Sequence, residues 1–478
     1  MSTPVAPSHA GPHIHEGASD RRSWWILGLI GLAQFMVILD VTVVNVALPS
    51  IGKALTFAAA DLQWVVTVYV LFTGGLMLLG GRATDLLGRR RVFLVGLLVF
   101  TAASLASGLA WSPVALIVAR AAQGFGAALL LPSALAIITT TYSGAQRTVA
   151  LSIWGAIGSA GVAVGVLFGG VITTLLGWEW IFFINVPIGF VVAVAAVRLL
   201  PAAQPLPPAR VKLDLLGAAT VMVGLVMLVY GVVGTAQHGW GSGRTLLLLG
   251  VAGALLAAFI GIERRGREPL VPPATWRVRS LVSSAVVMLG TTGILVGAFY
   301  LNTLYLQNVL GYSALKTGLS FLPLALVIFA AAHLASHLLP HAGSRVVGLG
   351  GLALTAGGAL LLAAAPDQAS YTTDVLPGFL LLGAGVGLVF VAVTVTAMAD
   401  VRHEQAGLAS GIMTTAHELG AALGVAVLAA VAIANGNPVS GYGNGFLVAA
   451  AIAALLAVVA VVALPALRPA PGTQASMH

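Results

Sequence analysis

The stretch WWILGLIGLAQFMVILDVTVVNVALPSI, residues 24–51, is apolar over more than the ~20 residues that a helix needs to cross a bilayer. It therefore predicts a transmembrane helix. Within it lies one aspartate, Asp40. A charged side chain at the centre of a span costs about 2.5–3.5 kcal/mol on insertion scales, so Asp40 is a candidate functional residue.

The composition of the whole chain points the same way. Of 478 residues, 59% are hydrophobic and 8% are charged, and the mean hydropathy is +1.03. Soluble domains carry roughly 25% charged residues. The chain contains no cysteine, which excludes disulfides, thiolate metal sites and cysteine nucleophiles. These properties predict a polytopic membrane protein and exclude a soluble enzyme.

About fourteen segments have the length and apolar character of membrane spans. The expected fold class is an all-α polytopic membrane protein with fourteen transmembrane helices. The spans are predicted near residues 24–48, 62–81, 92–110, 114–139, 149–176, 181–200, 214–236, 245–262, 281–306, 316–339, 345–365, 374–398, 407–433 and 445–466.

The basic residues indicate the orientation of the chain. Of 22 Lys and Arg residues, Lys53, Arg244 and Lys316 fall in the connections on one side, and Arg120 falls inside a span. All others fall in the tails and in the connections on the opposite side. Under the positive-inside rule, both termini are predicted to be cytoplasmic.

The formal net charge of +8 does not indicate a nucleic-acid partner, because the basic residues lie in short clusters between apolar runs. No lysine follows the glycine-rich loop of a nucleotide-binding motif. We therefore expect no nucleic acid and no cofactor, and a gradient has to supply any energy for transport.

Between the second and third predicted spans lies GGRATDLLGRRRVFLVG, residues 80–96. Asp85 and Arg89 are four residues apart, a spacing at which a carboxylate and a guanidinium meet on one helical turn. Gly81 and Gly88 permit a tight turn against neighbouring helices. A plain cytoplasmic loop would explain the arginines but neither the aspartate nor the glycines.

Two later spans carry residues at helical spacing. In the fourth, Arg120, Gln123 and Gly124 recur along the helix, and a lone intramembrane arginine has to face the bundle interior. A purely structural contact with carbonyl groups is the alternative for this arginine. The fifth has a smooth stripe of glycines, which lets helices approach closely: Gly155, Gly158, Gly161, Gly165 and Gly169.

Glu418 is the second acidic residue that is predicted to lie well within a span. It either has a function there or makes a local contact with His417. Three histidines, His333, His337 and His341, follow one another at steps of four, which would suit a metal ladder. No acidic residue lies nearby in the sequence and the run ends a span, so we predict no metal site.

These patterns resemble those of the major facilitator superfamily, in particular its fourteen-helix drug:proton antiporters. Residues 39–51, LDVTVVNVALPSI, are similar to the first-helix motif L-D-x-T-I/V-V-N-V-A-L-P, the most specific signal in the chain. Residues 80–96 resemble the loop signature G-x-x-x-D-x-x-G-R-R/K, and residues 120–124 resemble the fourth-helix motif R-x-x-Q-G. The stretch SHLLPHAGSRVVGLGG, residues 336–351, resembles a decayed second copy of the loop signature.

The fifth span is similar to the antiporter motif G-P-x-x-G-G at Gly165, Gly169 and Gly170. Val166 stands at the position of the motif's proline, so the kink linked to that proline is missing. This departure weakens the inference of antiport from the fifth span alone.

The resemblance implies two six-helix halves with a central cavity between them and two additional helices inserted in the middle. The expected domains are a disordered cytoplasmic tail (1–23), the N-terminal half (24–200), a linker with two additional transmembrane helices (201–262), a cytoplasmic loop (263–280), the C-terminal half (281–466) and a cytoplasmic tail (467–478).

Roles for individual residues follow from the resemblance and from the positions of the charged residues. Because an arginine does not release its proton, the expected role of Arg120 is to set the pKa of a nearby carboxylate or to organise water. The expected proton-coupling residues are Asp40, Arg120 and Glu418, with Asp40 as first choice. The expected conformational latch is Gly81, Asp85, Gly88, Arg89 and Arg90. The expected helix-packing glycines are Gly161, Gly165, Gly169 and Gly170. The expected cavity residues are Phe35, Asn45, Gln123, Gly124, Tyr300 and Tyr305, and Trp64 and Tyr69 are further aromatic candidates.

The functional hypothesis is a proton-coupled exporter of amphipathic drugs, antibiotics or secondary metabolites, in which a carboxyl group holds either a proton or a cationic substrate. A neutral or anionic substrate is an open alternative. Two other classes remain open, namely an importer or uniporter on the same fold and a non-transporting receptor or lipid-handling protein. We expect a monomer in the bacterial cytoplasmic membrane, with the lipid bilayer, protons and a small amphipathic organic substrate as partners.

Overall fold

The computed structural model describes residues 16–200, 214–265, 271–366, 369–401, 406–434 and 438–465. In this part of the chain, all regular secondary structure is helical, and 14 helices are long and apolar enough to cross a membrane. The predicted fold class is therefore confirmed. The predicted tail 467–478, residues 1–15 and the proline-rich linker 201–213 lie outside the described residues.

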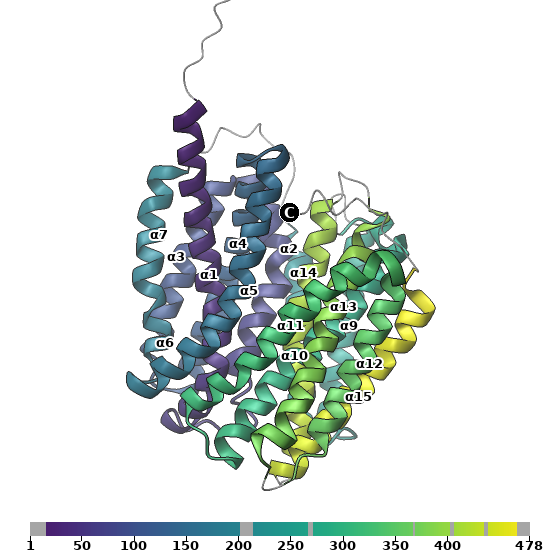
Figure 1. Ribbon diagram of the computed structural model, residues 1–478. Helices are drawn as coiled ribbons and strands as arrows, with labels where there is room; N and C mark the ends of the chain where they lie inside the picture. Colours follow the sequence, from purple (N-terminus) through teal and green to yellow (C-terminus); the bar gives the residue numbers. More distant parts are fainter. Residues whose placement is uncertain are drawn as a thin grey trace, which may run out of the picture.

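The first six spans form the N-terminal half, which Figure 1 shows in purple to blue on the left. Its sixth span is interrupted at Ile184 and consists of a short helix followed by a longer one. The helices are α1 (Glu16–Ala54), α2 (Trp64–Leu87), α3 (Arg89–Gly108), α4 (Pro113–Thr141), α5 (Gly144–Leu175), α6 (Trp180–Phe183) and α7 (Asn185–Leu199).

Helix α1 begins at Glu16, so residues 16–23 extend the first helix and do not belong to a disordered tail. The sequence of this part of the helix, EGASDRRS, is polar. The apolar span thus continues into a polar N-terminal extension.

The last six spans form the C-terminal half, shown in green to yellow in Figure 1. The two additional spans, α8 (Leu215–His238) and α9 (Gly243–Arg265), pack against each other, and α8 also contacts α2 and α14. The remaining elements are η1 (Pro273–Arg277), α10 (Arg279–Leu304), η2 (Tyr305–Val309), α11 (Ala314–Ala342), α12 (Ser344–Ala363), η3 (Tyr371–Val375), α13 (Leu376–Met398), α14 (Ala406–Ala434) and α15 (Pro438–Ala463).

The two halves repeat one connection in detail. Gly88, between α2 and α3, has φ 90°, and Gly343, between α11 and α12, has φ 80°, a conformation that favours glycine. Two residues after each glycine, an arginine reaches the C-terminal end of the last helix of its half. Arg90 donates to the carbonyl of Val197 (2.6 Å), and Arg345 donates to that of Leu464 (2.7 Å).

A second pair of arginines caps the same two helix ends. Arg22 of α1 donates to the carbonyl of Leu199 (3.0 Å), and Arg279 of α10 donates to that of Val462 (2.6 Å). Cations at helix C-termini satisfy free carbonyls and interact favourably with the helix dipole. The loop signature therefore has a structural copy in the C-terminal half, as the sequence predicts.

The halves meet along α2 with α14 and along α5 with α11. At one end of the molecule this contact is very close, because a Cβ on Gly170 would lie 2.7 Å from the carbonyl oxygen of Ala314, and one on Gly318 would lie 2.6 Å from that of Val166. At the same end, Gln307 donates to the carbonyl of Val46 (2.8 Å). Small residues thus close this end of the bundle.

Candidate functional site

A cavity of about 920 Å³ lies between the two halves. It is lined mainly by α1, α2, α4, α5, α10 and α14. Its lining extends from Asn45 and Val46, near the closed end, to Asp85 at the end of α2 and Gly407 at the start of α14. The cavity therefore reaches the end of the molecule that carries the α2–α3 connection.

Glu418 of α14 lines this cavity. Among the described residues, its carboxyl group has no hydrogen-bond or ion-pair partner. The Cβ of Glu418 would lie 2.5 Å from a Cβ placed on Gly74, so α2 and α14 touch at this point. The neighbouring His417 is held by a hydrogen bond between its Nδ1 and Thr292 (3.1 Å) and by an edge-on contact with Phe390.

Three other polar side chains that line the cavity have buried atoms without a partner in the described part of the chain. These atoms are Oε1 of Gln34, Oδ1 of Asn45 and the hydroxyl oxygen of Tyr69. The amide nitrogen of Asn45 donates to the carbonyl of Val41 (2.8 Å), which leaves its oxygen as a free acceptor. The lining of the cavity is thus mostly apolar with a few polar side chains, as is typical of sites for small molecules.

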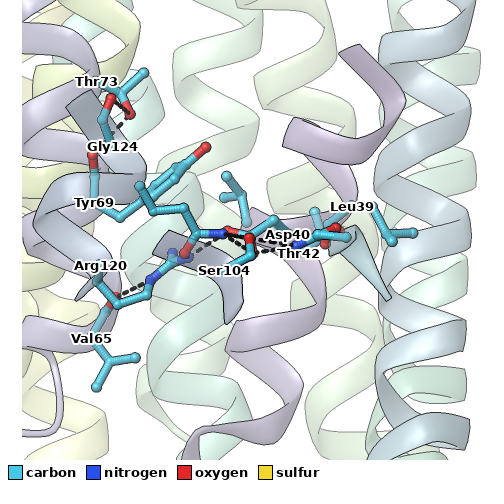
Figure 2. A network of polar contacts seen from close by, with 12 residues as sticks. Leu39, Asp40, Thr42, Val65, Tyr69, Thr73, Ser104, Arg120 and Gly124 are labelled. Carbon is cyan, nitrogen blue, oxygen red and sulfur yellow. Dashed lines mark hydrogen bonds and ion pairs between the residues drawn. The ribbon is translucent and has the colours of Figure 1, made fainter. Parts of the chain in front are cut away.

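Asp40 and Arg120 form a buried ion pair within the N-terminal half, as Figure 2 shows. The carboxylate of Asp40 also accepts hydrogen bonds from the amide nitrogens of Gln123 (2.7 Å) and Asn185 (3.0 Å). Both of these amides donate to the hydroxyl of Ser104, at 2.6 and 3.3 Å. The network therefore joins α1, α3, α4 and α7.

The guanidinium of Arg120 has further partners. Its Nε donates to the carbonyl of Val65 (3.0 Å), and one terminal nitrogen donates to Oε1 of Gln123 (2.8 Å). Its Cζ lies 4.2 Å from the ring centroid of Tyr69 and 5.7 Å from that of Phe182. Asp40 and Arg120 are 0% and 1% exposed, so the network supplies the polar contacts that water cannot.

The ion pair lies outside the cavity. Helix α1 presents one stripe to the cavity, which includes Gln34, Ile38, Thr42 and Asn45. At 100° per residue, Asp40 points away from this stripe and towards α4. The carboxylate that the sequence favours for coupling is therefore shielded from the cavity, and Glu418 is the one of the two that faces it.

Of the six residues predicted to line the cavity, Asn45 does so. The other five pack elsewhere, which corrects that prediction. Phe35 lies beside Gly161 of α5, Gln123 belongs to the buried network, and the backbone of Gly124 packs on α2. Tyr300 is buried in the C-terminal core, and Tyr305 stacks on Tyr442 (4.1 Å between centroids) and donates to the carbonyl of Pro366 (2.9 Å).

The predicted meeting of Asp85 and Arg89 is not observed, and in the described residues no ion pair joins them. Helix α2 ends at Leu87, and the positive φ of Gly88 turns the chain before α3 begins at Arg89. The two side chains therefore do not share a helix. Gly81 and Asp85 line the cavity instead.

The glycines of α5 lie where other helices approach closely. A Cβ on Gly161 would lie 3.0 Å from the side chain of Ile38, one on Gly165 would collide with Thr42, and one on Gly169 would lie 2.9 Å from the Cα of Val43, all on α1. Gly170 faces α11 instead. The stripe thus joins α5 to α1 within one half and to α11 across the halves.

The histidine run lies on α11, where Nε2 of His333 and Nε2 of His337 are 3.2 Å apart. Within the described residues, no group of three or more potential ligands is placed to hold a metal ion.

Two members of the network, Ser104 and Asn185, were not singled out from the sequence. Ser104 is one of three hydroxyl residues in the third span, together with Thr101 and Ser107, and nothing in the sequence sets it apart from them. Asn185 is a polar residue in the apolar run WIFFINVPIG, residues 180–189. The available signal for both was a polar residue within an apolar run. Nothing in the sequence pairs either residue with Asp40.

Comparisons with known proteins agree with this architecture. Residues 30–425 match the family model of the Major Facilitator Superfamily. The chain is 43% identical to the puromycin resistance protein of Streptomyces alboniger over 86% of this chain and 82% of that protein. It is 41% identical to the cephamycin export protein of Amycolatopsis lactamdurans over 87% of each.

Among solved structures, the fold is similar to that of a bacterial homologue of the human lysosomal transporter Spinster, in an inward-facing and unoccupied conformation. The TM-score is 0.64 at 17% identity, over 92% of this chain and 97% of that one, which compares the fold alone. The family match, the identities to export and resistance proteins and the fourteen spans together show that this chain belongs to the drug-efflux branch of the major facilitator superfamily.

Proposed function

We propose that this chain exports amphipathic drugs, antibiotics or secondary metabolites from the cytoplasm in exchange for protons. The observation that carries the proposal is an open, mostly apolar cavity beside a separate buried ion pair, Asp40 with Arg120. Midway along α14 the cavity is lined by the carboxyl group of Glu418, which has no hydrogen-bond or ion-pair partner among the described residues. Two carboxyl groups in different surroundings can respond to substrate and proton separately.

The cavity suits a drug-sized organic molecule. Its volume of about 920 Å³ lies in the upper part of the range typical of ligand sites. Tyr69, Trp154 and Phe299 contribute aromatic side chains to its lining, and Gln34 and Asn45 contribute amide side chains. An amphipathic substrate with an apolar body and a few donor groups would satisfy both.

For proton coupling, we assign different roles to the two carboxyl groups. Glu418 faces the cavity without a cationic partner, so it is available to hold either a proton or a cationic group of the substrate. Asp40 is already matched by Arg120, and its protonation would break the ion pair and loosen the contact of α1 with α4. Substrate binding beside Glu418 and protonation of Asp40 would thus take place at two separate positions in the bundle.

Alternating access would follow from rocking of the two halves. The end to which the cavity extends carries Arg82, Arg89, Arg90 and Arg91, and the positive-inside rule assigns that end to the cytoplasm. The opposite end is closed by Gly170 and its neighbours. The α2–α3 connection, with Gly88 at its turn, would be the latch that opens and closes with this motion.

The names of the relatives support the substrate class. Proteins 43% and 41% identical to this chain are named for puromycin resistance and for cephamycin export. We extend from them only the general class, an organic antibiotic or similar metabolite, and the direction, out of the cell.

The test is proton movement in proteoliposomes that contain a trapped pH-sensitive dye. Cationic, neutral and anionic amphipathic drugs are added in turn to the wild type and to Glu418→Gln. Drug-dependent proton flux in the wild type, reduced in the variant, is the expected result. No proton flux with any drug, together with counterflow that survives collapse of the proton gradient, would instead support the importer or uniporter.

A further inference from the structure

Tyr69 of α2 lies between the buried ion pair and the cavity. Its ring covers one face of the Arg120 guanidinium, with 4.2 Å between Cζ and the ring centroid, and the same residue lines the cavity. The network residues Asp40, Arg120, Gln123, Ser104 and Asn185 do not line it. Figure 2 shows the hydroxyl of Tyr69 directed away from the ion pair.

The position of the ring is fixed by its surroundings. It makes an edge-on contact with Phe100 of α3 (6.5 Å between centroids). The carbonyl of Tyr69 accepts a hydrogen bond from Thr73 (2.9 Å) and lies 2.4 Å from the place of a Cβ on Gly124. Because α2 and α4 are this close, the ring has little room to turn aside in this conformation.

Three charged or titratable groups on the helices around Tyr69 are close enough to act on it electrostatically. They are Arg120 from α4, Asp40 from α1 and Glu418 from α14. The ring thus separates the paired charges on one side from the cavity and its carboxyl group on the other. The hydroxyl has no hydrogen-bond partner among the described residues, so the ring is not held by its polar end.

We propose that Tyr69 is the gate that keeps cavity water, and with it protons, away from the Asp40–Arg120 pair while the cavity is open at the α2–α3 end. The proposal deepens the proposed function and rests on it for its consequence, which is that a proton on Asp40 does not leak to the side that the cavity faces. The aromatic ring forms the barrier, and the hydroxyl is not required.

The absence of cysteine from the chain permits a direct test of shielding. A thiol is introduced by Ser104→Cys, a near-isosteric change on the buried side of the ring, and is exposed to a small water-soluble thiol reagent in membranes. We expect slow labelling with Tyr69 or Tyr69→Phe and labelling about 10-fold faster or more with Tyr69→Ala, because only an accessible thiol reacts.

Two controls accompany these variants. Tyr300→Ala removes an equally buried tyrosine, also with an unpartnered hydroxyl, that does not line the cavity, so labelling at Ser104→Cys should stay slow. Thr414→Cys lines the cavity and should react rapidly in every background. If Tyr69→Ala does not accumulate, Tyr69→Leu, which fills most of the space without an aromatic face, should give an intermediate rate.

Equal labelling of Ser104→Cys with Tyr69 and with Tyr69→Ala would overturn the gate, and so would a Tyr69→Phe rate that matches Tyr69→Ala. Proton flux is then measured in the same variants without drug, where Tyr69→Ala is expected to leak protons and Tyr69→Phe is not. A wild type without drug-driven proton flux would refute the proposed coupling but leave the labelling result, and hence the shielding, standing.

Discussion

The two halves share a scaffold but hold charge inside the membrane in opposite ways. In the N-terminal half, Asp40 is paired with Arg120 and accepts hydrogen bonds from two polar side chains, those of Gln123 and Asn185. In the C-terminal half, α13 occupies the place of α4 and has no charged residue, and the acidic group of α14, Glu418, faces the cavity without a partner in the described chain.

This difference separates two uses of a buried charge. A matched pair with satisfied hydrogen bonds is costly to disturb, because loss of one partner leaves the other buried and alone. An unpaired carboxyl group beside a cavity can gain or lose a proton, or bind a cationic ligand, without leaving a buried partner charge alone. A change of charge in the N-terminal half therefore requires that an ion pair be broken, whereas a change of charge at Glu418 does not.

The largest expected effect is that of Asp40→Asn, which removes one charge of the pair. Breaking a buried ion pair from one side costs about 3–5 kcal/mol, so the free energy of unfolding should fall and drug-driven proton flux should be lost. Thermal unfolding in detergent and the trapped-dye assay measure the two effects. The double variant Asp40→Asn with Arg120→Gln should regain stability but not coupling. Normal pH-driven transport by Asp40→Asn would remove Asp40 from the mechanism.

Glu418→Gln sharpens the contrast, because it neutralises a charge that has no partner to lose. We expect the free energy of unfolding to stay within ~0.5 kcal/mol of the wild type, as for a substitution that breaks no buried contact. Drug-driven proton flux should fall about 10-fold or more for cationic drugs, since one RT ln 10 step, ~1.4 kcal/mol, is a modest value for a lost charge contact. A destabilisation as large as that of Asp40→Asn would contradict the difference between the halves.

Gly170→Ala tests the seam that joins the halves at the closed end. A Cβ there would lie 2.7 Å from Ala314 and Leu315, and overpacking of this kind costs typically ~1–3 kcal/mol. The population should shift towards a conformation that is open at that end, as measured by distances between introduced spin labels. The matched control is Gly155→Ala on the same helix, because a Cβ at Gly155 would meet nothing within 4 Å. This variant should leave the distances between the spin labels unchanged.

The smallest expected effects are those of Arg90→Ala and Arg345→Ala, the two corresponding capping arginines. Each should lower the free energy of unfolding by under about 1 kcal/mol, the usual worth of a cation at a helix C-terminus. The exposed Arg91→Ala serves as the control. Equal effects would show that the halves share this cap as a structural device. Loss of transport from Arg90→Ala alone would show that the N-terminal connection also acts as a latch.

Helical periodicity explains why part of the site could be predicted. The cost of charge in a membrane identified Asp40, Arg120 and Glu418 as residues that had to be accommodated inside the bundle, and the spacing of Arg120 and Gln123 placed both on one helix. The glycine stripe of α5 likewise indicated a close helix contact. These inferences depend only on the length, polarity and period of single helices.

Which residues of other helices these side chains contact could not be predicted in the same way. Tyr300 and Tyr305 have the residue type expected of a cavity wall, yet one is buried in the C-terminal core and the other stacks on Tyr442. Asp85 and Arg89 have the spacing of an ion pair, but Gly88 turns the chain between them. The type and spacing of residues on one helix do not determine which other helix its side chains contact.

The sequence alone determined that this protein is a fourteen-span membrane protein with three charged residues inside its bundle, because apolar length and the cost of buried charge are properties of each segment. Only the tertiary structure decided that Arg120 neutralises Asp40, that Glu418 faces the cavity and that Tyr69 lies between them. The physical reason is that these relations depend on contacts between helices far apart in the chain, which the period of a single helix cannot encode.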